Sequence, residues 1–208
     1  MQLFRKKIYC PNCHDQLDVA PKRKAKCPHC NKYIYIRQGN LLTEDEAQTV
    51  DWLVYLDQFG ITEQKFEKSR DELSKRFKMR ASAHDTVWSI LNSLVVAHPF
   101  SETAEWAYLE MARLVSQEGK DPQPYIEKAL RTRLMSYKAR GIKTVWVVGY
   151  DNDNGPDYST CPGCVELNRK KFSIDEALEK MPVPRNCTSG WCRCGYVAED
   201  PALEHDLI

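Results

Sequence analysis

The feature that most constrains the fold of this chain is the placement of its nine cysteines in two separate groups. The first group follows the pattern C-x2-C-x13-C-x2-C and consists of Cys10, Cys13, Cys27 and Cys30. Each C-x2-C pair places two thiolates on one turn, so two pairs supply the four soft ligands of a tetrahedral zinc. The segment is too short to bury a useful core, so metal binding must provide its folding energy. Residues 1–40 therefore predict a zinc ribbon, with a strand at residues 33–36 (YIYI).

The second group lies in the C-terminal part of the chain and contains Cys161, Cys164, Cys187, Cys192 and Cys194. One zinc takes four ligands, so one of these five cysteines is left over. Side chains alternate along an extended segment, which places the last two cysteines on one side and Arg193 on the other. Our first-choice ligand set is Cys161, Cys164, Cys187 and Cys192, with Cys194 as the alternative fourth ligand.

Regular structure is predicted around this second group. Residues 143–150 alternate as a strand does. Ser173 and Glu176 have the spacing of a capping box, which indicates the start of a helix. Apolar residues follow until the prolines of residues 182–184 end that helix. Residues 142–200 therefore predict an α+β module built on a four-cysteine zinc site.

Five elements of this C-terminal part occur in a fixed order: KTVWVV, CPGC, RKKFSIDEAL, PVP and CRC. In this order they resemble the C-terminal motif of the phage Mu F-like head morphogenesis family, whose members are minor capsid proteins. The resemblance covers about the last 60 of the 208 residues and implies a zinc-binding module and a role in phage head morphogenesis. The family has a His-Pro pair shortly before Cys-Arg-Cys. This chain has Cys187 and the longer spacer TSGW instead, and a cysteine in place of the histidine keeps a metal ligand.

The cysteines could instead be buried free thiols or disulfides. The N-terminal residues MQLFRKKIYCPNC lack the apolar stretch of a secretory signal, which favours metal ligation in a reducing cytoplasm over a disulfide framework. The longest aliphatic-aromatic run, at residues 145–148, is too short to cross a bilayer. We therefore expect no membrane contact and a cytoplasmic location, or a place in the virion if a phage encodes the chain.

Charge is distributed unevenly along the chain, although the formal net charge is only +1. Residues 1–38 carry nine Lys or Arg against two Asp, a net charge of +7. The most basic stretch contains Lys22, Arg23, Lys24 and Lys26, with tyrosines nearby. Basic and aromatic side chains together are typical of contacts with phosphates and bases, so nucleic acid or an acidic protein surface is the expected partner. The alternative is a solvated lysine-rich loop that keeps a small domain soluble.

Residues 41–141 have the apolar periodicity and the boundary signals of helices. Starts are predicted at five capping residues, which are Thr43, Thr62, Ser82, Ser101 and Asp121. Ends are predicted at Gly60, Pro99, Gly119 and Gly141. The second helix should place Phe66, Leu73 and Phe77 on one apolar face. We expect a helical bundle that contacts a protein partner.

The expected fold class is therefore mainly α with small β zinc modules. The predicted domains are a zinc ribbon at residues 1–40, a helical domain at 41–141 and a cysteine-rich zinc module at 142–200, followed by an acidic tail at 201–208. Two structural zinc ions are the expected cofactors.

Catalytic motifs are not evident in the sequence. It contains no H-E-x-x-H, P-loop, G-x-G-x-x-G or G-x-S-x-G pattern, and clusters with enough thiolates to fill the zinc shell leave no open position for water. We therefore assign no catalytic residue and predict a non-enzymatic zinc-binding interaction or assembly protein. The alternative is a metal-dependent nuclease, in which Asp151, Asp153 and Asp157 would hold magnesium near the C-terminal module.

Overall fold

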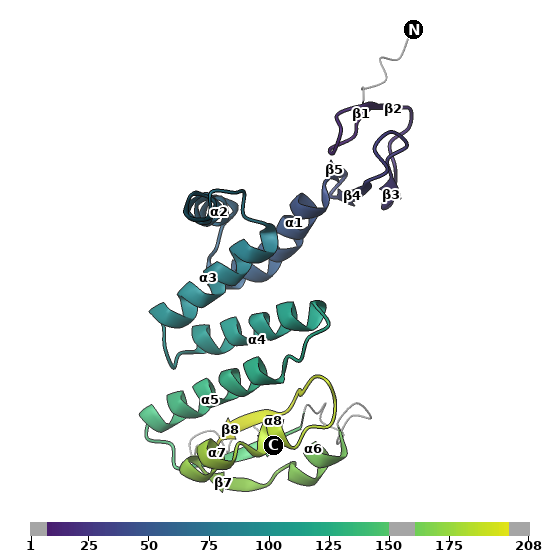
Figure 1. Ribbon diagram of the computed structural model, residues 1–208. Helices are drawn as coiled ribbons and strands as arrows, with labels where there is room; N and C mark the ends of the chain where they lie inside the picture. The colour runs from purple at the N-terminus through teal and green to yellow at the C-terminus, as the bar shows by residue number, and fades with distance from the viewer. Residues whose placement is uncertain (1–7, 150–160, 200–208) are drawn as a thin grey trace. The chain divides into compact units, whose positions relative to one another are not determined.

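The chain is mainly helical, with small antiparallel sheets near each cysteine group (Figure 1). The structure is a computed structural model that describes residues 8–149 and 161–199. The chain divides into two compact units after residue 90. The expected fold class, mainly α with small β zinc modules, is confirmed. Among the described helices, none has both the length and the apolar character needed to span a bilayer.

The ribbon at the start of the first unit consists of two small antiparallel sheets. Its strands are β1 (Ile8–Tyr9), β2 (Gln16–Leu17), β3 (Ala25–Lys26), β4 (Tyr33–Arg37) and β5 (Asn40–Leu42). β1 pairs with β2, and β4 lies between β3 and β5. The predicted strand at residues 33–36 is therefore present as β4. Gln38 and Gly39 both have positive φ in the tight turn between β4 and β5, a conformation that favours glycine.

Helix α1 (Glu44–Leu56) begins at the predicted capping box. The Thr43 side chain accepts a hydrogen bond from the Glu46 amide, and the Glu46 carboxylate accepts one from the Thr43 amide at 2.8 Å. The short helix η1 (Asp57–Phe59) continues from α1 and ends at Gly60, whose φ of 65° is left-handed. Both boundaries of this segment follow from local chemistry that is visible in the sequence.

Helices α2 (Glu63–Phe77) and α3 (Ala83–Ala97) begin at the predicted capping residues Thr62 and Ser82. The predicted apolar face of α2 is only partly buried. Phe66 is fully buried, whereas the side chain of Phe77 is 59% exposed. The helix ends at Lys78, which leaves Phe77 at its open end.

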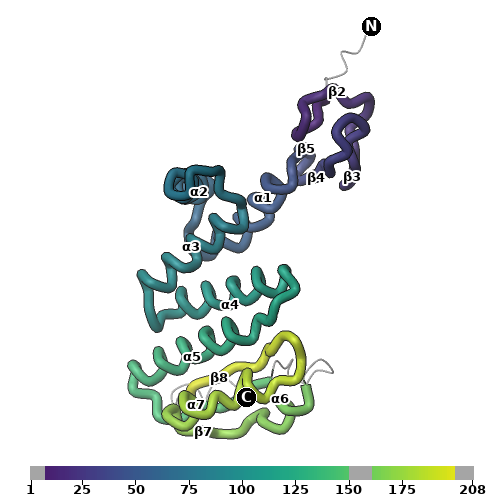
Figure 2. The backbone as a smooth tube through the Cα atoms, viewed as in Figure 1, coloured from purple at the N-terminus to yellow at the C-terminus, as the bar shows by residue number. Residues whose placement is uncertain are grey.

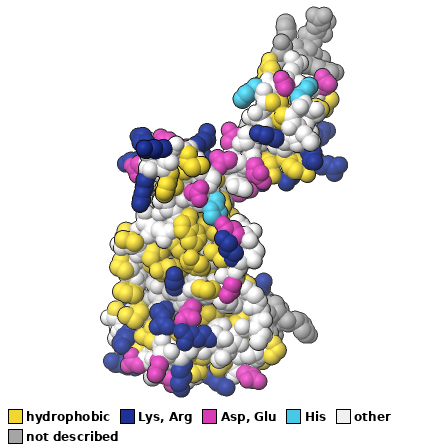
Figure 3. Space-filling model, in the orientation of Figure 1, with side chains coloured by type: hydrophobic (Ala, Val, Ile, Leu, Met, Phe, Trp, Pro, Cys, Tyr) yellow, Lys and Arg dark blue, Asp and Glu magenta, His cyan; other side chains and the backbone are white. Residues whose placement is uncertain are grey.

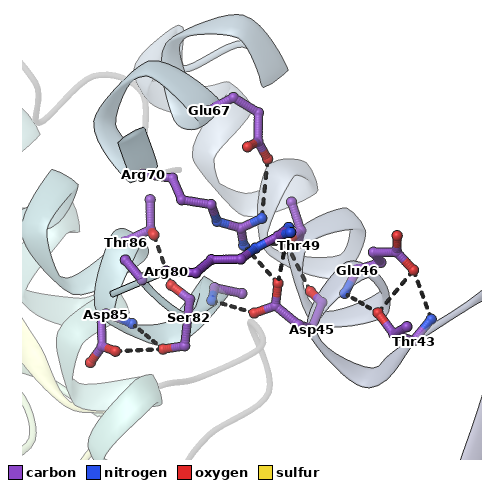
Figure 4. Close-up of polar contacts among 12 residues, drawn as sticks. Thr43, Asp45, Glu46, Thr49, Glu67, Arg70, Arg80, Ser82, Asp85 and Thr86 are labelled. Atoms are coloured by element: carbon purple, nitrogen blue, oxygen red, sulfur yellow. Dashed lines mark hydrogen bonds and ion pairs between the residues drawn. The ribbon is translucent and has the colours of Figure 1, made fainter. Parts of the chain in front are cut away.

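A buried arginine on α2 is linked to α1 and, through Asp45, to the start of α3 (Figure 4). The Arg70 side chain on α2 is only 5% exposed, and its guanidinium lies 3.2 Å from the Asp45 carboxylate on α1. It also donates to Thr49 Oγ1 at 2.8 Å and to Glu67 at 3.2 Å. Asp45 in turn accepts the Ala83 amide at the start of α3, at 2.6 Å. A buried cation needs such partners, because its desolvation costs several kcal/mol.

The second unit contains a helical hairpin of α4 (Glu102–Gln117) and α5 (Gln123–Ala139), which lie side by side (Figure 2). Ser101 caps α4 by accepting the Ala104 amide, and the chain leaves α4 through Gly119, whose φ is 73°. Asp121 accepts the Gln123 amide at 3.0 Å at the start of α5. Four of the five predicted capping residues therefore stand at the N-cap, whereas α5 starts one residue later than predicted, with Pro122 rather than Asp121 at the N-cap.

A three-stranded antiparallel sheet packs against α5. Its central strand is β6 (Thr144–Val148), which pairs with β7 (Lys171–Ser173) and β8 (Gly195–Ala198). The short helices of this region are α6 (Pro162–Leu167), α7 (Ile174–Lys180) and α8 (Pro182–Arg185). Ser173 caps α7 as predicted. Apolar side chains of α5, β6 and α7 form one core with the cysteines, so α5 belongs to the packing of the C-terminal module.

Candidate metal centres

The N-terminal cysteines form a compact cluster whose four sulfur atoms all lie within 4.8 Å of one another. The Sγ atoms of Cys10 and Cys30 are 3.9 Å apart, and those of Cys13 and Cys27 are 3.8 Å apart. Four sulfurs at 2.3 Å from one zinc would be separated by about 3.8 Å, so this donor set fits a tetrahedral zinc. The arrangement can hold a structural metal ion with a closed thiolate shell.

Each C-x2-C pair forms a tight turn that directs amide groups at its first sulfur. In the first turn, the Asn12 amide donates to Cys10 Sγ at 3.4 Å, and the His14 amide donates to the Cys10 carbonyl at 2.9 Å. His14 has a φ of 62°, which closes the turn. Burial acts to raise the pKa of the Cys10 thiol. Hydrogen bonds from the amides of Cys13 and Asn12 outweigh burial and lower this pKa to about 7. These amides therefore favour the thiolate that a metal requires.

The second turn repeats the first at a shift of 17 positions in the sequence. The His29 amide donates to Cys27 Sγ at 3.4 Å, and Asn31, with a φ of 59°, donates to the Cys27 carbonyl at 2.9 Å. The buried residues of the two halves also correspond, since Leu17 and Ile34 occupy equivalent positions in the small core. The ribbon is thus built from two equivalent hairpins, an internal repeat that our sequence analysis missed. Aligning the two C-P-x-C motifs would have revealed it.

The two hairpins are also linked by equivalent side-chain contacts. Asn12 Nδ2 donates to the Tyr33 carbonyl at 3.0 Å, and His29 Nε2 lies 3.2 Å from the Gln16 carbonyl. Asn12 and His29 occupy the same position in their turns. Gln16 and Tyr33, whose carbonyls they contact, likewise occupy the same position in the strands that follow. Each turn therefore holds the strand of the opposite hairpin.

The basic residues predicted to bind a partner lie on the surface of the ribbon, and all four are exposed: Lys22, Arg23, Lys24 and Lys26. Lys24 Nζ lies 4.4 Å from the ring centroid of Tyr33 and 4.5 Å from that of Tyr35. A hydrogen bond to Tyr35 raises the pKa of Lys24. Tyr33 is itself 46% exposed. The ribbon therefore presents cations and aromatic rings on one exposed surface.

The five C-terminal cysteines lie together but form two overlapping groups. The first group is Cys161, Cys164 and Cys187, and the second is Cys164, Cys192 and Cys194; within each group all sulfurs lie within 4.8 Å of one another. Cys161 and Cys187 are 3.7 Å apart, and Cys164 and Cys192 are 4.0 Å apart. These separations are those of thiolates sharing one zinc. The cluster can hold a metal ion, and it brings both candidate fourth ligands close to Cys164.

Three segments supply these sulfurs. Cys161 is the N-cap residue of α6, and Cys164 lies within that helix, so both come from one turn. The Thr188 amide donates to Cys161 Sγ at 3.4 Å. Burial acts to raise the pKa of Cys161. Hydrogen bonds from this amide and from the Cys164 thiol outweigh burial and lower the pKa to about 6. Cys187 follows α8, and the Cys-Arg-Cys segment immediately precedes β8.

Cys187 is the most accessible cysteine of the C-terminal cluster, and the other four are buried. Its sulfur lies 3.0 Å from Ser189 Oγ, and Cys187 is one of the residues that line an open cavity of about 600 Å³. Glu127 in this cavity binds Arg185 at 2.7 Å and Arg131 at 3.4 Å. Hydrogen bonds from Arg185, the larger effect, and from Arg131 hold the pKa of Glu127 below its usual value. This ion pair fixes α8, which leads directly to Cys187.

Carboxylate metal sites are not found among the residues that the structure describes. Within residues 8–149 and 161–199, every group of three or more potential metal ligands consists of cysteines alone. Asp151, Asp153 and Asp157, the carboxylates of the nuclease alternative, lie outside the described residues. The described residues therefore offer thiolate sites only.

Comparisons with known proteins give no relative from which a function could be transferred. No protein-family model, curated protein or solved structure matches the chain.

Proposed function

We propose that the chain is a non-enzymatic zinc-binding interaction protein in which each cysteine cluster holds one structural zinc. The observation that carries this proposal is the four-sulfur cluster of the ribbon, whose spacings of 3.8 and 3.9 Å suit one tetrahedral zinc. A shell of four thiolates leaves no position for water, so such a zinc supports the fold rather than hydrolysis.

The test of the zinc assignment is elemental analysis of the purified chain combined with an anaerobic thiol count. About two zinc ions per chain and one reactive cysteine are expected, because eight of the nine thiols would be ligands. A chain that carries no transition metal, or whose cysteines are oxidised in pairs under reducing purification, would contradict the proposal.

We assign the basic ribbon to nucleic-acid binding. Four thiolates and one Zn²⁺ would reduce the net charge of residues 1–38 from +7 to +5, so the ribbon stays basic with its metal bound. The exposed ring of Tyr33 beside Lys24 and Lys26 offers a stacking face together with phosphate contacts. Single-stranded nucleic acid, whose bases are open to stacking, is therefore the expected ligand.

Fluorescence anisotropy with a labelled single-stranded oligonucleotide tests this assignment. Glutamine at Lys22, Arg23, Lys24 and Lys26 should weaken binding and reduce the slope of log K against log salt by up to about 3. The matched control is glutamine at four exposed basic residues of α2: Lys65, Lys68, Lys75 and Arg76. Equal effects of the two variants would refute a ribbon site. Binding to poly-glutamate but not to the oligonucleotide would identify an acidic protein as the partner.

The helical part is the proposed surface for a protein partner. In the second unit, Val96, Phe100 and Trp106 have large exposed fractions of 80%, 56% and 42%. Figure 3 shows hydrophobic side chains gathered on the helical region. Exposed apolar side chains that gather into a contiguous patch mark surfaces that proteins cover. The resemblance of the C-terminal motif to Mu F-like proteins makes a phage head component the proposed partner.

A further inference from the structure

The C-terminal cluster has one more thiol than a single zinc can bind. Within the described residues, the ribbon has four sulfurs that all lie within 4.8 Å, whereas the C-terminal five satisfy this limit only as two groups of three. Cys164 belongs to both groups. It is also among the most buried of the five, with 1% of its surface exposed. Cys164 is therefore the sulfur on which any ligand set in this cluster depends.

Cys192 and Cys194 are closely matched as candidate ligands. They are 4% and 6% exposed, whereas Arg193 between them is exposed. Both sulfurs lie within 4.8 Å of Cys164 and of each other. Both precede the first paired residue of β8, Gly195, so the strand pairing does not favour one over the other. Burial therefore does not distinguish the two, and both sulfurs lie within reach of a metal ion bound by Cys164.

We propose that Cys192 and Cys194 are interchangeable fourth ligands of the C-terminal site, with Cys161, Cys164 and Cys187 as its constant ligands. This inference rests on the proposed function, in which the cluster holds one zinc. In the exchange, the spare thiol gives up its proton as its sulfur becomes a ligand, and the departing sulfur takes up one proton. The charge of the cluster stays the same, and no oxidant or reductant is needed.

Alanine variants test the interchange, because alanine offers no ligand atom. Cys192→Ala and Cys194→Ala should each keep about two zinc ions per chain, with zinc affinities within about tenfold of each other, and each should lose the one reactive thiol. The double variant and Cys164→Ala should retain only about one zinc, that of the ribbon. The ribbon zinc serves as an internal reference for a folded, metal-loaded chain in every sample.

A second readout is the absorption of thiolate-bound Co²⁺, which reports four-sulfur coordination independently of the zinc content. Both single variants should keep the four-thiolate spectrum at the C-terminal site. Loss of the C-terminal zinc in only one of the two single variants would identify a unique fourth ligand and overturn the inference. Loss of this zinc in both single variants would also overturn it. A wild-type chain with no zinc in this cluster would instead refute the proposed function there.

Discussion

A Cβ atom on Gly163 would lie only 2.3 Å from the carbonyl oxygen of Asn186. Gly163 lies between Cys161 and Cys164, and Asn186 immediately precedes Cys187. The close approach of these two backbone segments places the Cys187 sulfur 3.7 Å from that of Cys161. Only glycine lets two of the sulfur-bearing segments approach this closely.

Gly163→Ala should therefore reduce zinc affinity at the C-terminal site, since the two segments must separate to accommodate the methyl group. The ribbon zinc should be unaffected. The control is Gly190→Ala in the same module, because a Cβ atom there would meet no atom within 4 Å. Competition with a chromophoric chelator measures both affinities. Equal affinities in the two variants would show that the contact does not shape the site.

The buried ion pair of Arg70 and Asp45 should contribute strongly to stability. Asp45→Asn removes one of the two carboxylates that face the buried guanidinium and leaves only that of Glu67, so we expect a cost of about 2 kcal/mol or more in the free energy of unfolding. Asp51→Asn makes the same change on the same helix, but the Arg37–Asp51 pair is exposed on both sides and should contribute less than about 1 kcal/mol. Urea unfolding compares the two variants. A cost for Asp51→Asn equal to that for Asp45→Asn would contradict the role of burial.

Acid should selectively weaken the contacts of Glu127. Because Arg185 and Arg131 lower its folded-state pKa below the usual 4.5, the carboxylate stabilises the fold above pH 4.5. That contribution to stability is lost as the pH falls through the folded-state pKa of Glu127. The stability difference between wild type and Glu127→Gln should therefore shrink as the pH falls below 4.5. Glu179→Gln, at an exposed position of α7, is the control for the loss of one carboxylate. Urea titrations at a series of pH values measure both.

Removal of zinc should unfold the ribbon while the second unit keeps its helices. Within residues 8–42, the ribbon core contains only Leu17 and Ile34 besides its buried cysteines, with a few partly buried neighbours. The core around α5 includes Ile126, Leu134 and Val145 and does not depend on metal for its apolar packing. After chelation, hydrogen exchange should reach the amides of β4 rapidly and those of α5 slowly. Loss of protection in α5 together with β4 would contradict this difference.

The sequence was most informative where structure depends on neighbouring residues. Thr43 and Ser101 begin helices because their side chains bond to amides within one turn, which a short motif reveals. The exposure of Phe77 could not be read from helical periodicity, because it depends on where the neighbouring helices end. The contribution of α5 to the core of the C-terminal module could not be read from the sequence either, because it depends on how α5 packs against β6 and α7.

For the sites, the cysteine spacing indicated which sulfurs would meet, because a C-x2-C pair carries its own turn. It could not indicate that Cys164 would be shared between two sulfur groups, since that depends on how the Cys-Arg-Cys segment returns beside Cys164. The contact between Gly163 and Asn186 likewise joins segments that are distant in the sequence.

The paired contacts of Asn12 and His29 have a consequence for how the ribbon can be divided. Each turn contacts a strand of the other hairpin through a side chain, so neither hairpin alone contains all the contacts that hold its strands. A peptide cut between the two C-P-x-C motifs would lose half of the metal ligands and also the side chain that closes its remaining strand. The two hairpins of the ribbon must therefore fold together. During synthesis, the first hairpin can complete its contacts only after the second has been made.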